Sequence, residues 1–288
     1  MYDLIISGSN AKHFAKTIKH PHILVKNNAV RICHINYPFS NGLIGSARAE
    51  RLDANLVKSG LSIQDIRLIA FDMDCTLIEI DCIDHLAEQM GCGEVVSAMT
   101  VAAMQGKTDF HSHMRNSIRL LKGAGERELE RTLRSASLAP GARSFIEFAQ
   151  SHGVLTYIIS GGLSQIAGPI CRSLNMTGFI SNELVIENKT LNGELIGPAG
   201  GVILDAPGKR RTLEILSMMH GIKLNQTLAV GDGANDLEML DAAGIGVAYR
   251  AKPIVREKAR YHVNHGTMDV IQDLFIESWE KAEKLTVA

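Results

Sequence analysis

Asp72 and Asp74 are the first residues of this chain whose type and spacing suggest chemistry. They follow the apolar run 68–71, which is short and bounded by polar residues, as a buried parallel strand should be. Alternate side chains of a strand share a face, so the two carboxylates are expected to converge at the edge where α/β sheets bind ligands. A magnesium ion would relieve their repulsion because it prefers hard oxygen ligands. For an isolated pair, the alternative is a strand end with acidic turn residues.

Two later stretches could bind a phosphate group. Ser160 and Gly161 follow the apolar run 154–159, and such a turn can bring backbone amides close to an anion. Lys209 stands at the start of an expected helix, where the helix dipole disfavours a cation unless a phosphate or carboxylates compensate. The alternatives are an ordinary strand-to-helix turn for the first stretch and a solvated surface lysine for the second.

A third stretch adds Asp232, Asn235 and Asp236, directly after an expected strand at 228–230. These residues look like a second acidic contribution to a metal site. The glycines around them do not form a dinucleotide fingerprint, which would require a glycine at position 236. A helix cap would explain one of the three polar residues but hardly all of them.

The chain around these residues alternates between strands and helices, which predicts an α/β fold with a parallel sheet and right-handed crossovers. Helical segments without a strand follow the first strand and suggest a cap over the site. Expected strands are 68–71, 154–159, 178–180, 227–230 and a final one at 244–248, with a hairpin at 183–195; expected helices after the cap include 164–174, 209–219, 235–243 and one around 270–275.

Three regions follow from this pattern. Residues 1–65 are expected to form a small N-terminal α+β accessory segment without a chemical motif. Residues 66–78 and 140–288 are expected to form the catalytic core, and 79–139 the helical cap inserted into it. His111 and His113 in the cap are expected to be exposed, since a spacing of two places them on different helix faces.

Composition excludes several classes of function. The 288 residues include 30 lysines and arginines against 31 aspartates and glutamates, which indicates neither a nucleic-acid nor a membrane surface. The chain shows no signal peptide and no apolar run of membrane-spanning length, so a cytoplasmic location is expected. Its five cysteines form no CxxC pair and indicate neither a disulfide framework nor a zinc site.

Taken together, the four stretches resemble the four motifs of the haloacid dehalogenase (HAD) superfamily, in order and context, over roughly residues 66–275. They are DxDxT at 72–76, Ser160 after an apolar strand, Lys209 at a helix start and GDGxND at 231–236. Within that superfamily, the chain most resembles the phosphoserine phosphatase family. The segments that carry this resemblance are LIAFDMDCTLIEIDCID, KTDFHSHMRNSIRLLKG, IISGGLSQIA, LDAPGKRRTL and AVGDGANDLEML. The resemblance implies a Rossmann-like sheet with the helical insertion as its cap.

The resemblance also implies a phosphatase mechanism with a role for each residue. Asp72 would be the nucleophile that forms an aspartyl-phosphate, and Asp74 the general acid and base. Mg²⁺ would be bound by Asp72, the Asp74 backbone carbonyl and Asp232. Ser160, Gly161 and Lys209 would hold phosphate oxygens, Asn235 would position phosphate or water, Asp236 would orient Lys209 or a metal-bound water, and Thr76 would support the site.

Three positions depart from the family pattern. Cys75 stands where the family most often has serine, and Asp81 where a glutamate contacts the substrate amino group. Ser117 stands where an arginine binds the substrate carboxylate, and serine cannot replace that charge. Arg115 and Arg119 flank Ser117 but are expected to point away from its helix face.

The expected substrate is therefore a small phosphorylated metabolite, with phosphoserine favoured and serine biosynthesis as the implied pathway. Another small phosphate ester, or phosphoryl transfer to an acceptor other than water, would use the same mechanism. From a different class, the chain could be an inactive regulatory protein that contacts a partner through residues 1–65. A homodimer is left open.

Overall fold

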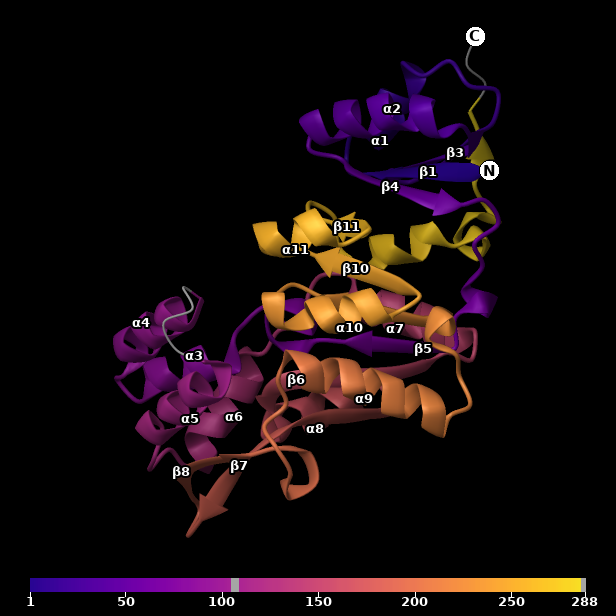
Figure 1. The fold of residues 1–288 in the computed structure, drawn as a ribbon. Helices are drawn as coiled ribbons and strands as arrows, with labels where there is room; N and C mark the ends of the chain where they lie inside the picture. Colours follow the sequence, from indigo (N-terminus) through magenta and orange to yellow (C-terminus); the bar gives the residue numbers. More distant parts are fainter. Residues whose placement is uncertain (105–108, 286–288) are drawn as a thin grey trace.

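The computed structural model describes residues 1–104 and 109–285, so the first two residues of the segment KTDFHSHMRNSIRLLKG, at 107–108, lie outside the described residues. The chain forms a seven-stranded sheet of order β11-β10-β9-β5-β6-β7-β8 and a five-stranded sheet of order β12-β2-β3-β1-β4. Figure 1 shows the smaller sheet and its two helices at one end of the molecule and the helical cap beside the other end of the larger sheet.

The larger sheet is parallel except for β8, which pairs antiparallel with β7. This confirms the predicted α/β class and the hairpin. The strands are β5 (Leu68–Phe71), β6 (Leu155–Leu163), β7 (Gly178–Glu187), β8 (Thr190–Ile196), β9 (Thr227–Gly231), β10 (Ile245–Tyr249) and β11 (Tyr261–Val263).

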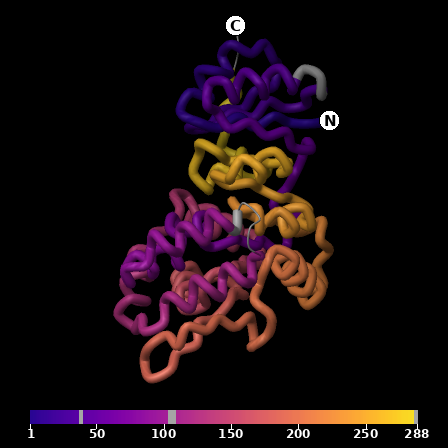
Figure 2. Tube along the Cα trace, turned by 60° about the vertical axis from the view of Figure 1, so that its left-hand side comes forward, coloured from indigo at the N-terminus to yellow at the C-terminus, as the bar shows by residue number. Residues whose placement is uncertain are grey.

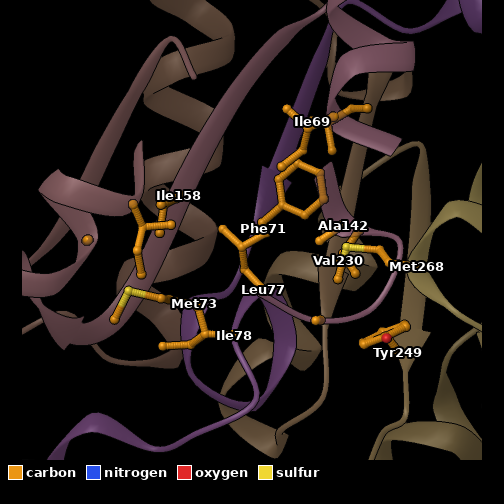
Figure 3. Close-up of a cluster of buried hydrophobic side chains, with 14 of the residues drawn as sticks. Ile69, Phe71, Met73, Leu77, Ile78, Ala142, Ile158, Val230, Tyr249 and Met268 are labelled. Carbon is orange, nitrogen blue, oxygen red and sulfur yellow. The ribbon is translucent and has the colours of Figure 1, made fainter. Parts of the chain in front are cut away.

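Helices cover both faces of this sheet because β5 is apolar on both of its faces. Ile69 and Phe71 belong to an apolar cluster (Figure 3) that includes residues of α7 (Ala142–Ser151) and α8 (Ser164–Ser173). The ring centroids of Phe71 and Phe145 lie 5.9 Å apart. Leu68 and its neighbours on the other face pack with α9 (Ala206–Met219), α10 (Leu237–Ala242) and α11 (Pro253–Lys258). The end of β5, which leads into Asp72, is therefore fixed between two apolar layers.

The C-terminal region differs from the prediction in three ways. The strand at 245–249 is not the last in its sheet, because the three-residue strand β11 follows it and is too short to leave a pattern. The predicted helix around 270–275 is a 3₁₀ helix, Met268–Leu274; its buried residues Met268, Ile271 and Leu274 recur every third position, the period of that helix. Further on, β12 (Glu283–Lys284) pairs with β2 of the smaller sheet.

The described residues of the cap form four helices: α3 (Cys82–Gln89), α4 (Gly93–Met104), α5 (Phe110–Leu120) and α6 (Glu126–Ser135). The two segments that join it to the core pair with each other, through an antiparallel bridge between Ile78 and Leu138 and a 2.9 Å hydrogen bond from Ala139 N to Leu77 O. The cap is thus connected to the core by a two-stranded ribbon. No helix in the described parts of the chain has both the length and the apolar character needed to cross a bilayer.

The N-terminal segment folds around the smaller sheet in the order β1 (Tyr2–Ser7), α1 (Ala11–Lys16), β2 (Ile23–Lys26), β3 (Ala29–Ile35), α2 (Tyr37–Ala49) and β4 (Asp53–Lys58). This βαββαβ order is that of the ferredoxin-like motif. The segment has an apolar cluster of its own, which includes Leu4, Ile6 and Phe14. The domain limits given above remain a prediction.

Buried polar contacts join this lobe to the C-terminal part of the core, against which it lies in Figure 2. The Asp53 carboxylate accepts hydrogen bonds from the backbone N–H groups of Asn264, His265 and Gly266, at 2.7 to 3.3 Å. The Asn55 side chain exchanges two hydrogen bonds of 2.8 Å with the backbone of His262. The lobe is thus attached by specific bonds as well as by packing.

We predict that Asp53→Ala lowers the free energy of unfolding by about 2–5 kcal/mol, because three backbone N–H groups lose their acceptor inside the molecule. Urea unfolding would measure it. Lys58→Ala, at an exposed position of the same strand, is the control and should change stability by less than about 0.5 kcal/mol. An Asp53→Ala protein as stable as the control would contradict the prediction.

Candidate active site

The ends of three neighbouring strands bring the predicted site residues together. Asp72 directly follows β5, Ser160 lies near the end of β6, and Asp232 directly follows β9. Strand β5 pairs in parallel with β6 on one side and with β9 on the other, so all three residues lie at the carboxyl edge of the sheet. All three are buried. This edge, where the strand order changes direction, is where open α/β sheets bind their ligands.

Lys209 bridges two of the acidic residues. Its Nζ lies 2.7 Å from Asp72 Oδ1 and 2.6 Å from Asp236 Oδ1, and the side chain is 1% exposed. The lysine sits in the first turn of α9, whose N-cap Asp205 accepts a hydrogen bond from Gly208 N. Burial alone would lower the pKa of Lys209, but the carboxylates of Asp236 and Asp72 raise it well above its usual value. The ammonium therefore stays charged.

Asp72, Asp232 and Asp236 form a buried cluster in which one carboxylate oxygen of each lies within 4.8 Å of the others. Burial, with the charge of Asp236, raises the pKa of Asp72 well above its usual value and that of Asp232 to about 6. The Thr76 hydroxyl donates to Asp232 Oδ1 at 3.0 Å. The three carboxylates carry more negative charge than the single ammonium of Lys209 can balance, so the cluster can accept a further cation. Hard oxygen donors of this kind suit a divalent metal such as Mg²⁺.

Asp236 also holds the loop that carries Asp232. Its Oδ2 accepts the backbone N–H groups of Asp232 at 3.1 Å and Gly233 at 2.9 Å. A Cβ on Gly231 would lie 2.5 Å from Asp236 Cγ, so this close approach needs glycine there. The same carboxyl group thus orients Lys209 through one oxygen and shapes the loop that carries Asp232 through the other.

The Asp74 carboxylate does not join this cluster, contrary to the expectation that it converges with Asp72 on a regular strand. After Asp72 the chain turns, and Cys75 adopts a left-handed conformation with φ of 58°. Asp74 Oδ1 instead accepts the Cys82 N–H at 3.0 Å. Burial, followed by the charge of Asp81, raises the pKa of Asp74 to about 7, which suits a group that gives and takes a proton at neutral pH. Its metal contribution, predicted through the backbone carbonyl, remains a prediction.

A buried asparagine that the sequence did not single out holds the backbone at Gly161 in place. Asn182, on β7, donates from Nδ2 to Gly161 O at 2.7 Å, and its Oδ1 accepts Leu204 N–H at 2.7 Å. It therefore ties the loop at Ser160 to the segment that leads into α9 and Lys209. In the sequence, Asn182 is marked only as an amide residue between the expected strand at 178–180 and the expected hairpin at 183–195. This signal is too weak to indicate a role.

Two predicted substrate-binding residues, Asp81 and Asn235, are less buried than the aspartate cluster. Asp81 is exposed and is the N-cap of α3, its Oδ1 accepting the N–H groups of Ile83 and Asp84 at 2.9 and 3.1 Å. Capping does not exclude a substrate contact, since Oδ2 takes no part in it. Asn235 is half-buried in the loop between Asp232 and Asp236.

The expectation that His111 and His113 are exposed is wrong. Both are half-buried, because α5 packs against the core on one side and against the other cap helices on the other. His111 Nε2 forms a 2.9 Å hydrogen bond with Asp205 Oδ2, so it joins the cap to the start of α9. Ser117 is fully buried.

Lys252 is a further residue that the sequence did not indicate. Its backbone N–H donates to Asp232 O at 3.0 Å. Burial raises the pKa values of Asp232, Asp84 and Cys75, and the charge of Lys252 offsets part of that rise. Its exposed side chain therefore adds positive charge near Asp232.

A cavity of about 680 Å³ between α6, α8 and β7 is lined by none of the predicted site residues.

Comparison with known proteins gives a family and several relatives. A model of haloacid dehalogenase-like hydrolases matches residues 69–241. The phosphoserine phosphatase SerB2 of Mycobacterium tuberculosis is 36% identical over 234 residues, which are 81% of this chain and 56% of that protein. The phosphoserine phosphatase of Albidiferax ferrireducens is 37% identical over 217 residues, 75% of this chain and 92% of that protein. This chain thus spans little more than half the length of the first relative.

A solved structure shares nearly the whole fold. A HAD family hydrolase from Salmonella enterica serovar Typhi superposes with a TM-score of 0.84 at 28% identity, over 95% of this chain and 98% of that one. This likeness includes the smaller sheet as well as the core and confirms the predicted fold class.

We predict that Gly162→Ala lowers phosphatase activity about a hundredfold, because the new Cβ would lie 2.2 Å from Asp74 Oδ2 and displace that carboxylate. Steady-state kinetics with a small phosphate ester would measure it, and circular dichroism would confirm the fold. Gly42→Ala, where a Cβ meets nothing within 4 Å, is the control. Unchanged activity of Gly162→Ala would show that Asp74 need not occupy this position.

Proposed function

Because this chain belongs to the family of haloacid dehalogenase-like hydrolases, we propose that it is a magnesium-dependent phosphatase that hydrolyses O-phospho-L-serine to L-serine and phosphate. The observation that carries the proposal is the buried Asp72 carboxylate, paired with Lys209 beside two further aspartates. The choice of phosphoserine rests on relatives named as phosphoserine phosphatases, which match 75% and 81% of the chain.

In the first half-reaction, an Asp72 oxygen attacks the phosphorus of the ester and forms an aspartyl-phosphate while the bond from phosphorus to the serine oxygen breaks. Asp74, whose pKa of about 7 keeps a large fraction protonated at neutral pH, gives its proton to the departing oxygen. Lys209 is ion-paired with Asp72 at 2.7 Å and places its charge beside the transferring group.

In the second half-reaction, Asp74 takes a proton from water as the water oxygen attacks the phosphorus. The bond between phosphorus and the Asp72 oxygen breaks, which releases phosphate and restores the carboxylate. Ser160 and the amide groups of its loop would bind phosphate oxygens throughout, held in place by Asn182.

A magnesium ion would be held by Asp72, Asp232 and the Asp74 backbone carbonyl. When bound, it would offset the negative charge of the transferring phosphoryl group. The excess of carboxylates over ammonium groups in the buried cluster supports this choice of partner. Serine biosynthesis is the pathway that such an activity would serve; a cytoplasmic location and a homodimer remain predictions.

Two other readings of the same site remain open to test. The chain could hydrolyse another small phosphate ester or transfer the phosphoryl group to an acceptor other than water, with the same residues. An inactive regulatory protein is disfavoured, because Asp72, Asp74 and Lys209 all stand in suitable positions.

We predict that the purified protein hydrolyses phosphoserine with Mg²⁺ faster than it hydrolyses phosphoethanolamine or glycerol phosphate, and that EDTA abolishes the reaction until Mg²⁺ is restored. Released phosphate would be measured for each ester. A preference for an ester without a carboxylate would indicate that the substrate is another small phosphate ester. No hydrolysis of any ester would indicate an inactive regulatory protein.

We also predict that Asp72→Asn lowers kcat by more than about a thousandfold while the fold is kept, since an amide cannot attack phosphorus as a carboxylate does. Phosphate release and circular dichroism would be compared with those of Asp241→Asn, at an exposed position of α10. Normal turnover by Asp72→Asn would overturn the assignment of the nucleophile.

A further inference from the structure

The cavity of about 680 Å³ lies between the cap and the core, outside the aspartate cluster. Its walls are helix α6 of the cap, helix α8 and strand β7 of the core, and the residues Pro198 and Ala199, which follow β8. Cavities that bind small molecules usually have volumes of about 300–1,000 Å³. This one is therefore large enough for an organic molecule of metabolite size, and no step of the phosphatase mechanism uses it.

Apolar side chains face this cavity from both sides. Leu129 and Leu133, one helical turn apart on α6, line it from the cap, and Phe179 on β7 lines it from the core. A Cβ on Gly168 would lie 3.4 Å from Phe179 Cζ, so the glycine lets the ring lie against α8. The ring is still 38% exposed. An apolar surface of this kind is stabilised when the apolar part of a ligand covers it.

A buried hydroxyl in the same wall has no partner. Ser181 lies two residues after Phe179 on β7, so both side chains are on one face of the strand. The residue is 4% exposed and lines the cavity, and its Oγ has no hydrogen-bond partner in the parts of the chain that the structure describes. Buried polar atoms are nearly always hydrogen-bonded. The hydroxyl is therefore available to a polar group of a bound molecule.

The charged residues around the cavity are mostly acidic. Glu126 and Glu130 on α6 and Glu183 on β7 line it, against the single guanidinium of Arg172 on α8. Glu130 pairs with Arg134 at 3.4 Å, whereas the other two glutamates form no ion pair with any residue that the structure describes. This charge balance favours a ligand with a positive charge. The exposed aromatic ring can stabilise the same charge through a cation–π contact.

We propose that this cavity is a second binding site, which takes a small organic cation with an apolar body, such as an amine joined to an aromatic ring. The apolar body covers the leucines of α6 and the Phe179 ring, and the ammonium group lies beside Glu126 and Glu183. The binding itself does not depend on the proposed function.

A ligand in this cavity contacts the cap and the core at once. The full set of contacts exists only while the two are packed together, so the ligand stabilises that arrangement. The ribbon at Ile78 and Leu138 joins the cap to the core, and the cap supplies the Cys82 N–H that Asp74 accepts. Occupation of the cavity therefore slows the separation of the cap from the core.

The first test is isothermal titration calorimetry of the whole chain with tryptamine, an indole ring on a short chain that ends in an ammonium group. Indole-3-propionate has the same ring but ends in a carboxylate, so it is the matched control probe. We expect saturable binding of tryptamine and binding of indole-3-propionate that is at least about tenfold weaker.

Variants locate the binding. Glu126→Gln combined with Glu183→Gln should weaken tryptamine binding about tenfold, and Phe179→Ala should weaken it as well. All three side chains are exposed, so these changes are expected to leave the fold intact. Glu94→Gln combined with Glu147→Gln removes two exposed charges at positions that do not line the cavity and should bind tryptamine like the wild type.

The effect on the cap is tested by hydrogen exchange of the backbone amides of α6 and of the ribbon, with and without tryptamine. Slower exchange of both would support it, and unchanged exchange despite binding would overturn the claim that the ligand holds the cap. No saturable binding, equal binding of the two probes, or unchanged affinity after loss of both glutamates would overturn the site itself. None of these measurements uses catalysis, so this proposal and the proposed function can fail separately.

Discussion

The charge balance around Lys209 is the constraint on which the rest of the structure depends. Asp72 and Asp236 share its ammonium at 2.7 and 2.6 Å, and Asp232 lies in the same buried cluster. Charges in such a place are costly unless they are paired at good geometry, so the elements that carry them must meet accurately. Strand β5, the loop after β9 and helix α9 are fixed relative to one another by this requirement. The remaining negative charge makes the cluster suitable for a divalent metal ion.

Hydrogen bonds outside this charge network position other parts of the site. Asn182 connects Gly161 to the segment before α9, and the Asp205 carboxylate caps that helix while it contacts His111 of the cap. A displacement of the loop would therefore be transmitted to the helix that carries Lys209. Residues of this kind contact no reacting atom, yet the geometry of the site depends on them.

The sequence predicted the parts of this arrangement that local patterns encode. The buried strand before Asp72 and the helix at Lys209 each have a short local signal. The turn expected after residue 159 is wrong, because β6 continues through Ser160 and Gly161 to Leu163, and the glycines there adopt extended backbone. Contacts between distant segments leave no such signal. The bond between Asn182 and Gly161 and that between His111 and Asp205 depend on how whole layers pack. The segment 268–274 is a 3₁₀ helix, whereas its apolar spacing also fits an α-helix, because so few residues match both the 3.0- and the 3.6-residue period.

The position of Asp74 depends on core and cap together. Its Oδ1 is held by the N–H of Cys82, the first residue of α3, while its Oδ2 lies against Gly162 of β6. The cap itself is attached by a paired ribbon and by the contact between His111 and Asp205, which is partly exposed and therefore weak. A cap that moved away from the core would take the Cys82 N–H with it and leave the Asp74 carboxylate without that bond. The position of the Asp74 carboxylate therefore depends on the cap and the core being packed together.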